Sequence, residues 1–274
     1  MFVFIKLLLN QGHELNIFDT DNSLAGNIAA ETGSSAYNSI QDLLSESDTV
    51  IICTPIGITP EIIEEVSSNT SRDLRVVEIS SIKNQTVLAL ERNSEKITPL
   101  SLHPMFGPDV DSIEGQRIVI VPVIDRDREE KFTRELFPGA DIMVLDAETH
   151  DRSMALILSL PYFMNSVFLR CMVDEDLTLL RKMGGPTFRT QLALAHTILG
   201  EDPLFVESLI EDNVYAGDIL TKYIDELKYL RRMLKSRPKK LVEYYEENKE
   251  EMKSDPEFSN ARHIRNLFLQ ENQE

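Results

Sequence analysis

Four polar side chains that could bind a ligand or move a proton each follow an apolar, β-branched run. They are Asp19, Thr54, Ser81 and His103. The carboxyl ends of parallel strands meet at one edge of a sheet, where α/β proteins bind their ligands. A histidine there can take a proton near neutral pH, and a hydroxyl partner can fix its tautomer. The pattern allows Ser81 and His103 to converge at this edge, but a lone histidine more often makes a structural hydrogen bond, which is the preferred interpretation from the pattern alone.

The elements that must position these side chains alternate between strands and helices. Strands are expected at 15–18, 49–53, 74–79, 97–102 and 117–121, with helices such as 2–9, 59–67 and 85–92 between them. This alternation indicates βαβ units and a mainly parallel sheet. From about residue 148 the pattern changes to helices alone, at 152–173, 188–199, 204–210 and 216–235, followed by a charged helical tail. The sequence therefore predicts a Rossmann-like α/β domain over 1–148 and an all-helical domain over 149–274.

Asp19 ends the first expected strand, where a dinucleotide fold places an acidic residue. Such a carboxylate accepts hydrogen bonds from both ribose hydroxyls and repels a 2′-phosphate, which predicts NAD rather than NADP as the cofactor. Asp21 and Asn22 follow at once, so a turn or helix-capping role for Asp19 is the alternative.

The glycine-rich loop that should precede Asp19 is not in this sequence. A dinucleotide site needs a strand, a Gly-x-Gly-x-x-Gly loop and a helix, but the sequence begins inside the expected helix 2–9. Without the central first strand, its neighbours would face each other with unpaired backbone groups. Two hypotheses remain open, a true start upstream or a loss of cofactor binding. We expect the first, and hence an N-terminally incomplete first domain, because losing a central strand should prevent folding.

Composition excludes several classes of protein. The 274 residues hold 28 Lys+Arg against 46 Asp+Glu, a net charge of −18, which disfavours a nucleic-acid partner. Only Cys53 and Cys171 occur, so a disulfide scaffold and a cysteine-rich zinc site are excluded and no metal is expected. No apolar run of bilayer length and no signal peptide is evident. The sequence predicts a cytoplasmic protein without a membrane partner.

Several segments together resemble one enzyme family. LHPMFGPD at 102–109 is similar to the signature of prephenate dehydrogenases, the enzymes of tyrosine biosynthesis. SSIK at 80–83, CTPI at 53–56 and THDRSM at 149–154 resemble further segments of that family. The stretch 186–210 resembles its arginine-bearing helix, in the version found in fused chorismate mutase–prephenate dehydrogenases. The resemblance covers most of the chain.

The resemblance implies an oxidative decarboxylation. Prephenate would lose a ring-hydroxyl proton, a hydride to NAD and CO2, giving 4-hydroxyphenylpyruvate. His103 matches the family's base, Ser81 the hydroxyl that orients it, and Arg189 the arginine that holds a substrate carboxylate. A guanidinium suits that role because it is always charged and binds carboxylates in bidentate fashion. Without the motif, Arg189 would be taken for a surface helix residue.

Other matching positions carry weaker expectations. His150 should lie near the substrate, with a structural place at a helix start as an equal alternative. Asp109 should contribute to a substrate lid, unless it serves only the turn. Cys53, Thr54 and Pro55 match the family's cofactor-side loop.

One departure from the family pattern concerns substrate binding. Twelve residues after His150 the family usually has a second histidine in a motif like LxHF, whereas this sequence has Tyr162 in LPYF. A tyrosine can donate a hydrogen bond but is neutral at pH 7. Arogenate therefore stays open as the substrate, and a catalytically silent regulatory or assembly module stays open as a function. The family's helical domain usually dimerises, which predicts a homodimer through 149–274.

Overall fold

The computed structural model describes residues 2–70, 73–107, 110, 112–236 and 238–270. The chain forms two compact units, which we call the first unit (residues 1–154 and 207–214) and the second unit (155–206 and 215–274). The division falls after Met154 rather than after residue 148, and a short later segment returns to the first unit. Each unit is described by itself below.

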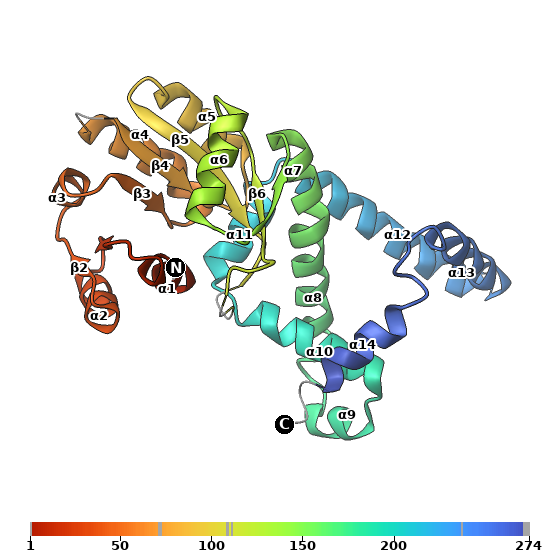
Figure 1. The fold of residues 1–274 in the computed structure, drawn as a ribbon. Helices are drawn as coiled ribbons and strands as arrows, with labels where there is room; N and C mark the ends of the chain where they lie inside the picture. Colours follow the sequence, from red (N-terminus) through yellow and green to blue (C-terminus); the bar gives the residue numbers. More distant parts are fainter. Residues whose placement is uncertain (1, 71–72, 108–109, 111, 237, 271–274) are drawn as a thin grey trace. The chain divides into compact units, whose positions relative to one another are not determined.

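The first unit is built on a five-stranded sheet in the order β3-β4-β5-β6-β7 (Figure 1). Its strands are β3 (Thr49–Ile52), β4 (Leu74–Glu78), β5 (Ile97–Pro104), β6 (Arg117–Ile120) and β7 (Asp141–Val144). β6 runs antiparallel to β5, and the other neighbours are parallel. The sheet is therefore mainly parallel, as the alternating pattern predicted. Sequence reasoning did not foresee the antiparallel pair β5–β6, which makes β6 and β7 run opposite to the other three strands.

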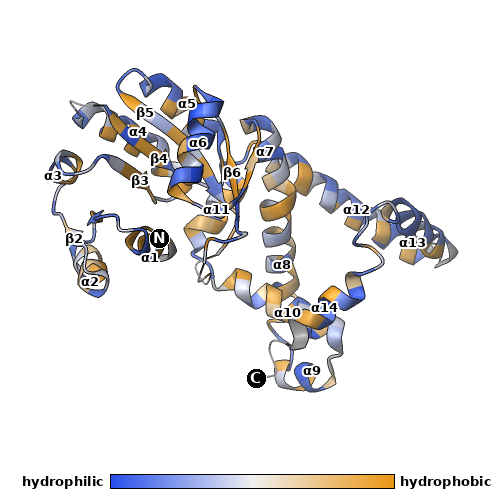
Figure 2. Ribbon diagram, viewed as in Figure 1, coloured by the Kyte–Doolittle hydropathy of each residue, from blue (hydrophilic) through white to orange (hydrophobic). Residues whose placement is uncertain are grey.

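Helices cover both faces of this sheet because successive strand residues point to opposite sides. Val76 packs in a core with residues of α4 (Thr59–Asn69) and α5 (Asn84–Asn93). Val77 packs in a second core with residues of α1 (Phe2–Asn10) and α6 (Arg126–Leu136). Apolar residues accordingly run along β3, β4 and β6, while α6 is largely hydrophilic (Figure 2).

A smaller sheet lies at the start of the first unit. β1 (Asn16–Ile17) pairs in parallel with β2 (Ser35–Ala36), and α2 (Asn22–Thr32) connects them. The helix α3 (Ile40–Ser45) follows. Within the described chain, no strand pairs with both sheets.

Two differences from the expected elements affect the site. β5 runs to Pro104 instead of ending at Leu102, because pairing with β6 continues through Leu102–Pro104 after β4 has ended. His103 is therefore inside a strand. The short strands β2 and β7 were not predicted, since each has only a few residues and β7 alternates exposed with half-buried side chains.

The later part of the chain is helical. α7 (Ala147–Met154) continues through a π-helical turn (Ala155–Ser159) into α8 (Leu160–Arg170). The helices that follow are α9 (Leu177–Met183), α10 (Pro186–Leu199), α11 (Pro203–Glu211), α12 (Ala216–Ser236), α13 (Pro238–Met252) and α14 (Ala261–Gln270). In the second unit α8 and α10 pack together, and Gln191 Nε2 donates to Asn165 Oδ1 across them at 2.5 Å.

The continuous helix Ala147–Arg170 is long and apolar enough to span a bilayer by length and composition alone. This differs from the sequence expectation that no apolar run is long enough, because three helical segments join without a break. Only 22% of its most apolar window is buried, and Leu156 and Ile157 are about half exposed at 52% and 51%. A helix that pairs with another protein surface meets the same criteria, so this is weak evidence for a membrane.

Candidate active site

His103 lies near the carboxyl end of β5 and is 5% exposed. β4 ends at Glu78, which pairs with Ser101 of β5, and His103 pairs only with Val119 of β6. The histidine is thus placed where a parallel neighbour has ended and an antiparallel one continues. Pairing with β6 holds its backbone on one side, and the ring position depends on the side chains around it.

A second histidine holds the ring of His103. His103 Nδ1 lies 2.9 Å from His150 Nε2, and His150 Nδ1 lies 2.7 Å from Asp151 Oδ1. The two rings meet edge to face at 65°, with centroids 5.1 Å apart. His150 and Asp151 are fully buried on α7. Three side chains therefore form one hydrogen-bonded row, which we call the Asp–His–His row.

Asp151 is anchored at the start of α5. Its Oδ1 accepts from the backbone N–H of Lys83 and its Oδ2 from that of Asn84, each at 2.9 Å. These are among the first N–H groups of the helix, which lack partners within it, and a carboxylate is favoured at this positive end. The backbone oxygen of Asp151 also accepts from Asn213 Nδ2 at 2.8 Å. Hydrogen bonds therefore fix both the carboxylate and the backbone of Asp151.

A fully buried ion pair lies beside this row. Lys83 Nζ is 2.7 Å from Glu78 Oε1 and also donates to the backbone oxygen of Leu102, the residue before His103. Glu78 accepts in addition from the backbone N–H of Ser80 at 2.8 Å and from the Ser101 hydroxyl. A buried pair is tolerated when its remaining donors and acceptors are satisfied. Among the described residues no buried side-chain nitrogen or oxygen lacks a partner.

The electrostatics of the cluster keep His103 neutral. Burial lowers the pKa of His103 well below 6.5, and the Lys83 charge and His150 lower it further. Burial also lowers the pKa of Lys83, although Glu78 and Asp151 oppose that shift. A neutral imidazole has a lone pair, so His103 can act as a proton acceptor at pH 7.

Ser81 is half-buried just after β4, and no hydrogen bond links it to His103 among the described residues. Sequence reasoning gave Ser81 the task of orienting His103, whereas here His150 makes that contact. The histidine partner is a stronger anchor, since its own ring is fixed by Asp151.

Two other candidate substrate-binding residues belong to the second unit. Arg189 is exposed near the start of α10, and its guanidinium makes no hydrogen bond or ion pair with the described residues. The half-buried ring of Tyr162 on α8 stacks edge to face on Phe205, with centroids 6.1 Å apart. Burial and the nearby Glu201 charge raise the pKa of its hydroxyl. Asp109 lies outside the described residues.

The candidate cofactor residues follow β1 and β3 in the first unit. Asp19 Oδ1 accepts from the backbone N–H of Asp21 at 2.8 Å, so the turn role expected as the alternative is present, while Oδ2 has no partner in the described chain. Exposed Cys53 follows β3, and the Thr54 hydroxyl lies 2.9 Å from that of Thr59. Pro55 precedes a short 3-10 turn.

Sequence reasoning missed Glu78, Lys83 and Asp151. A weak signal for Glu78 existed, because it follows Val76 at the spacing of one strand face in an otherwise apolar run. Asp151 gave no local signal, since its carboxylate accepts from backbone N–H groups 68 and 67 positions away. Lys83 lies only five positions after its partner Glu78, but the sequence alone does not show that the two are buried. Within the described residues, no group of histidine, cysteine or acidic side chains is arranged to hold a metal ion.

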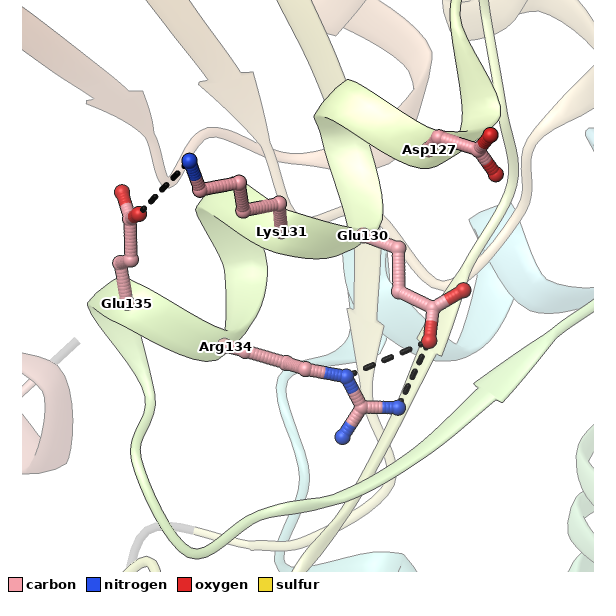
Figure 3. Close-up of a pocket in the computed structure, with 5 residues that line it drawn as sticks. All are labelled: Asp127, Glu130, Lys131, Arg134 and Glu135. Atoms are coloured by element: carbon pink, nitrogen blue, oxygen red, sulfur yellow. Dashed lines mark hydrogen bonds and ion pairs between the residues drawn. The ribbon is translucent and has the colours of Figure 1, made fainter.

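A shallow hollow over α6 has a different character (Figure 3). Its walls are charged side chains of a single helix, paired as Arg134 with Glu130 at 2.7 Å and Lys131 with Glu135 at 3.9 Å. Such i,i+4 pairs are ordinary features of a solvated helix. No buried group opens into the hollow, so it offers no chemistry.

Comparison with known proteins identifies the family of the chain. Residues 5–132 match the family described as "Prephenate dehydrogenase, nucleotide-binding domain", and residues 146–247 match "Prephenate dehydrogenase, dimerization domain". A "Probable arogenate/prephenate dehydrogenase" of Methanocaldococcus jannaschii is 25% identical over 242 residues, covering 85% of this chain and 54% of the relative. The "T-protein" of Enterobacter agglomerans is 26% identical, covering 75% and 56%. The chain thus spans about half the length of these relatives.

Solved structures share the fold. A prephenate dehydrogenase of Aquifex aeolicus in complex with hydroxyphenyl propionate and NAD+ superposes with a TM-score of 0.75 at 20% identity, covering 93% of this chain and 94% of that one. A Synechocystis arogenate dehydrogenase superposes with a TM-score of 0.65 at 17% identity, covering 91% and 95%. The two matched domains together account for most of the sequence, and on that evidence the chain belongs to the prephenate dehydrogenase family.

Proposed function

We propose that this protein oxidises prephenate to 4-hydroxyphenylpyruvate with NAD+ as hydride acceptor. The observation that carries the proposal is a neutral, buried histidine whose second nitrogen is free. His103 Nε2 has no partner in the described chain, yet it is not among the buried unsatisfied atoms, so it reaches the accessible surface. A lone pair held in this way suits a general base.

In the proposed reaction His103 removes the proton of the ring hydroxyl. The carbon bearing that oxygen then loses its hydrogen as a hydride, and the ring carboxylate leaves as CO2 while the ring becomes aromatic. His103 Nε2 holds the proton while His150 and Asp151 support the imidazolium through their hydrogen bonds. The proton then returns to the phenolate oxygen of the product, which leaves His103 neutral. The lowered pKa of His103 ensures that the base is unprotonated before each turnover.

Further substrate contacts are proposed for the remaining candidate residues. Arg189 would bind a substrate carboxylate, because an exposed guanidinium without a protein partner is free to form a bidentate pair. Tyr162, kept neutral by its raised pKa, would donate a hydrogen bond. Ser81 would offer its hydroxyl to the substrate, and Asp109 would contribute to a lid.

The residues after β1 and β3 fit the cofactor. The free Oδ2 of Asp19 can accept from a ribose hydroxyl while Oδ1 keeps its turn contact. Cys53, Thr54 and Pro55 would line the nicotinamide side at the end of β3. NAD+, when bound, supplies the hydride acceptor. A carboxylate at position 19 disfavours the 2′-phosphate of NADP.

The test is a turnover assay with the full-length protein. NAD+ reduction is followed with prephenate and with arogenate as separate substrates, and then with NADP+ in place of NAD+. We expect turnover with prephenate and NAD+. Turnover with arogenate alone would move the substrate assignment to the amino acid, as the Tyr162 departure allows. A folded protein that turns over neither substrate would be the silent module.

The second unit supports a homodimer as the working assembly. Exposed apolar side chains lie on α8 and α10, including Met164, Val167, Leu194 and Leu199, within the residues matched to a dimerization domain. Side chains of this kind are buried when obligate dimers form. Sedimentation equilibrium should give twice the chain mass, and a monomer at micromolar concentration would contradict the assignment.

A further inference from the structure

We propose that Asp151 and His150 act as positioning residues that fix the tautomer of His103, so that Nε2 always carries the lone pair. The catalytic consequence rests on the proposed function, because it matters only if His103 is the base. The tautomer itself is a property of the folded chain. It can be measured without substrate or cofactor.

The direction of each hydrogen bond follows from the aspartate. An ionised carboxylate only accepts, so the 2.7 Å contact requires a proton on His150 Nδ1. In a neutral imidazole the other nitrogen then carries the lone pair, and His150 Nε2 must accept across the 2.9 Å contact. His103 Nδ1 is therefore the donor. Its proton is on Nδ1 and its lone pair is on Nε2, the nitrogen that faces away from the row.

The opposite assignment requires His150 to be a cation with protons on both nitrogens. The surroundings argue against it, because the Asp151 charge is already compensated by two backbone N–H donors at the start of α5. The other charged groups at the cluster are Lys83 and Glu78, which pair with each other. A positive charge on fully buried His150 would lose its hydration, and no uncompensated negative charge among the described residues of the cluster would offset that loss.

The decisive measurement is nitrogen-15 NMR of the histidine rings in the full-length protein near neutral pH. The chain has five histidines, so His103 and His150 can be assigned from single variants, with exposed His263→Gln as the matched control. We expect proton-bearing Nδ1 and bare Nε2 for both His103 and His150. A proton on Nε2 of His103, or an even mixture of its two tautomers, would overturn the proposal.

Two variants of His150 separate positioning from packing. His150→Gln keeps an oxygen that can accept from His103 Nδ1, whereas His150→Leu fills the space without an acceptor. We expect the glutamine to retain the single His103 tautomer and the leucine to lose it. The leucine should also lower kcat by roughly 10-fold to 100-fold with little change in KM, and alter the acid side of the pH–rate profile.

The outcomes distinguish this proposal from the proposed function. A single His103 tautomer that persists in His150→Leu would show that the row does not set it, whatever the activity. The expected tautomers in a protein that turns over neither prephenate nor arogenate would leave the row intact and remove its catalytic use. Should His150→Leu fail to fold, the wild-type spectrum and that of His150→Gln still show whether Nε2 of His103 carries the lone pair.

Discussion

Two pairs of charged residues in the first unit share their chemistry but not their surroundings. Lys83 and Glu78 meet at 2.7 Å and are fully buried, whereas Arg134 and Glu130 on α6 meet at 2.7 Å with side chains 55% and 28% exposed. Distance alone would rank them as equals. Burial decides the difference, because water can replace a lost partner on α6 but cannot do so beneath His103.

The comparison also separates two uses of charge. On α6 the charges keep a helix face solvated, and neither residue orients a third group. In the buried cluster the pair fixes the backbone beside His103 through the Leu102 oxygen, and Lys83 helps to lower the histidine's pKa. Fixed charges next to a titratable group are costly to bury, but they set the protonation state of that group.

The largest expected effect comes from breaking the buried pair. Lys83→Met should lower the free energy of unfolding by about 3–5 kcal/mol, because Glu78 is left charged and buried. Urea unfolding measures the loss. Lys131→Met on α6 is the matched control and should change stability by less than about 0.5 kcal/mol. Equal effects at the two lysines would contradict the contrast.

Removing the proposed base should affect rate rather than binding. His103→Asn should lower kcat by roughly 10²–10⁴-fold with little change in KM, because a general base typically contributes that factor. The acid limb that protonation of His103 imposes on the wild type should vanish in the variant. Steady-state kinetics across pH measure both. A variant with near-normal kcat and an unchanged acid limb would exclude His103 as the base.

Arg189 is an exposed charge without a protein partner in the described chain, so replacing it should weaken substrate binding and leave stability unchanged. Arg189→Ala should weaken substrate binding by about 1.5–3 kcal/mol, seen mainly as a higher KM, through loss of a charge-assisted carboxylate contact. Stability should hardly change, since the guanidinium makes no described contact. An unchanged KM, or a loss of kcat alone, would show that Arg189 does not hold the substrate.

Acid should destabilise the first unit through His103. The pKa of His103 is lowered in the folded chain, so the unfolded chain binds the proton more readily. The free energy of unfolding is therefore highest above the pKa that His103 has in the unfolded chain, about 6.5, and it decreases as pH falls from there toward the lower pKa of the folded chain. Denaturant unfolding at several pH values should show this decline, with a shallower slope in His103→Asn. Identical slopes would exclude this titration.

The smallest effect belongs to α6. Arg134→Ala should cost about 0.3–0.5 kcal/mol, and added salt should reduce even that, because the pair is exposed and screened. Thermal unfolding at low and high salt measures it. A loss comparable to that of Lys83→Met would mean that exposure is a poor guide to the value of an ion pair in this chain.

Local sequence patterns correctly predicted elements whose ends are marked by nearby residues. The strands at β3 and β4 and the change to helices alone came from apolar runs and their punctuation. The end of β5 did not, because its last residues pair with an antiparallel neighbour that no local signal announces. Likewise the resemblance singled out His103 and His150, but the groups that hold them became visible only when the chain was folded.

The missed residues share a physical cause. Glu78, Lys83 and Asp151 are charged, and charged side chains are normally at the surface. Each is buried because its partner comes from another element, such as Asp151 of α7 at the start of α5. The sequence shows that a charged residue is present, but it does not show which partner residue offsets the desolvation cost of burying it. Buried charges are therefore the hardest part of a site to foresee.

Asn213 has a consequence for how the protein is made. It is 2% exposed, belongs to the segment 207–214 of the first unit, and donates to the backbone oxygen of Asp151. A ribosome releases residues in order, so the segment that secures Asp151 emerges some sixty positions after the aspartate itself. During synthesis, the first unit therefore lacks the hydrogen bond from Asn213 to Asp151 until residues 155–206 of the second unit have been made.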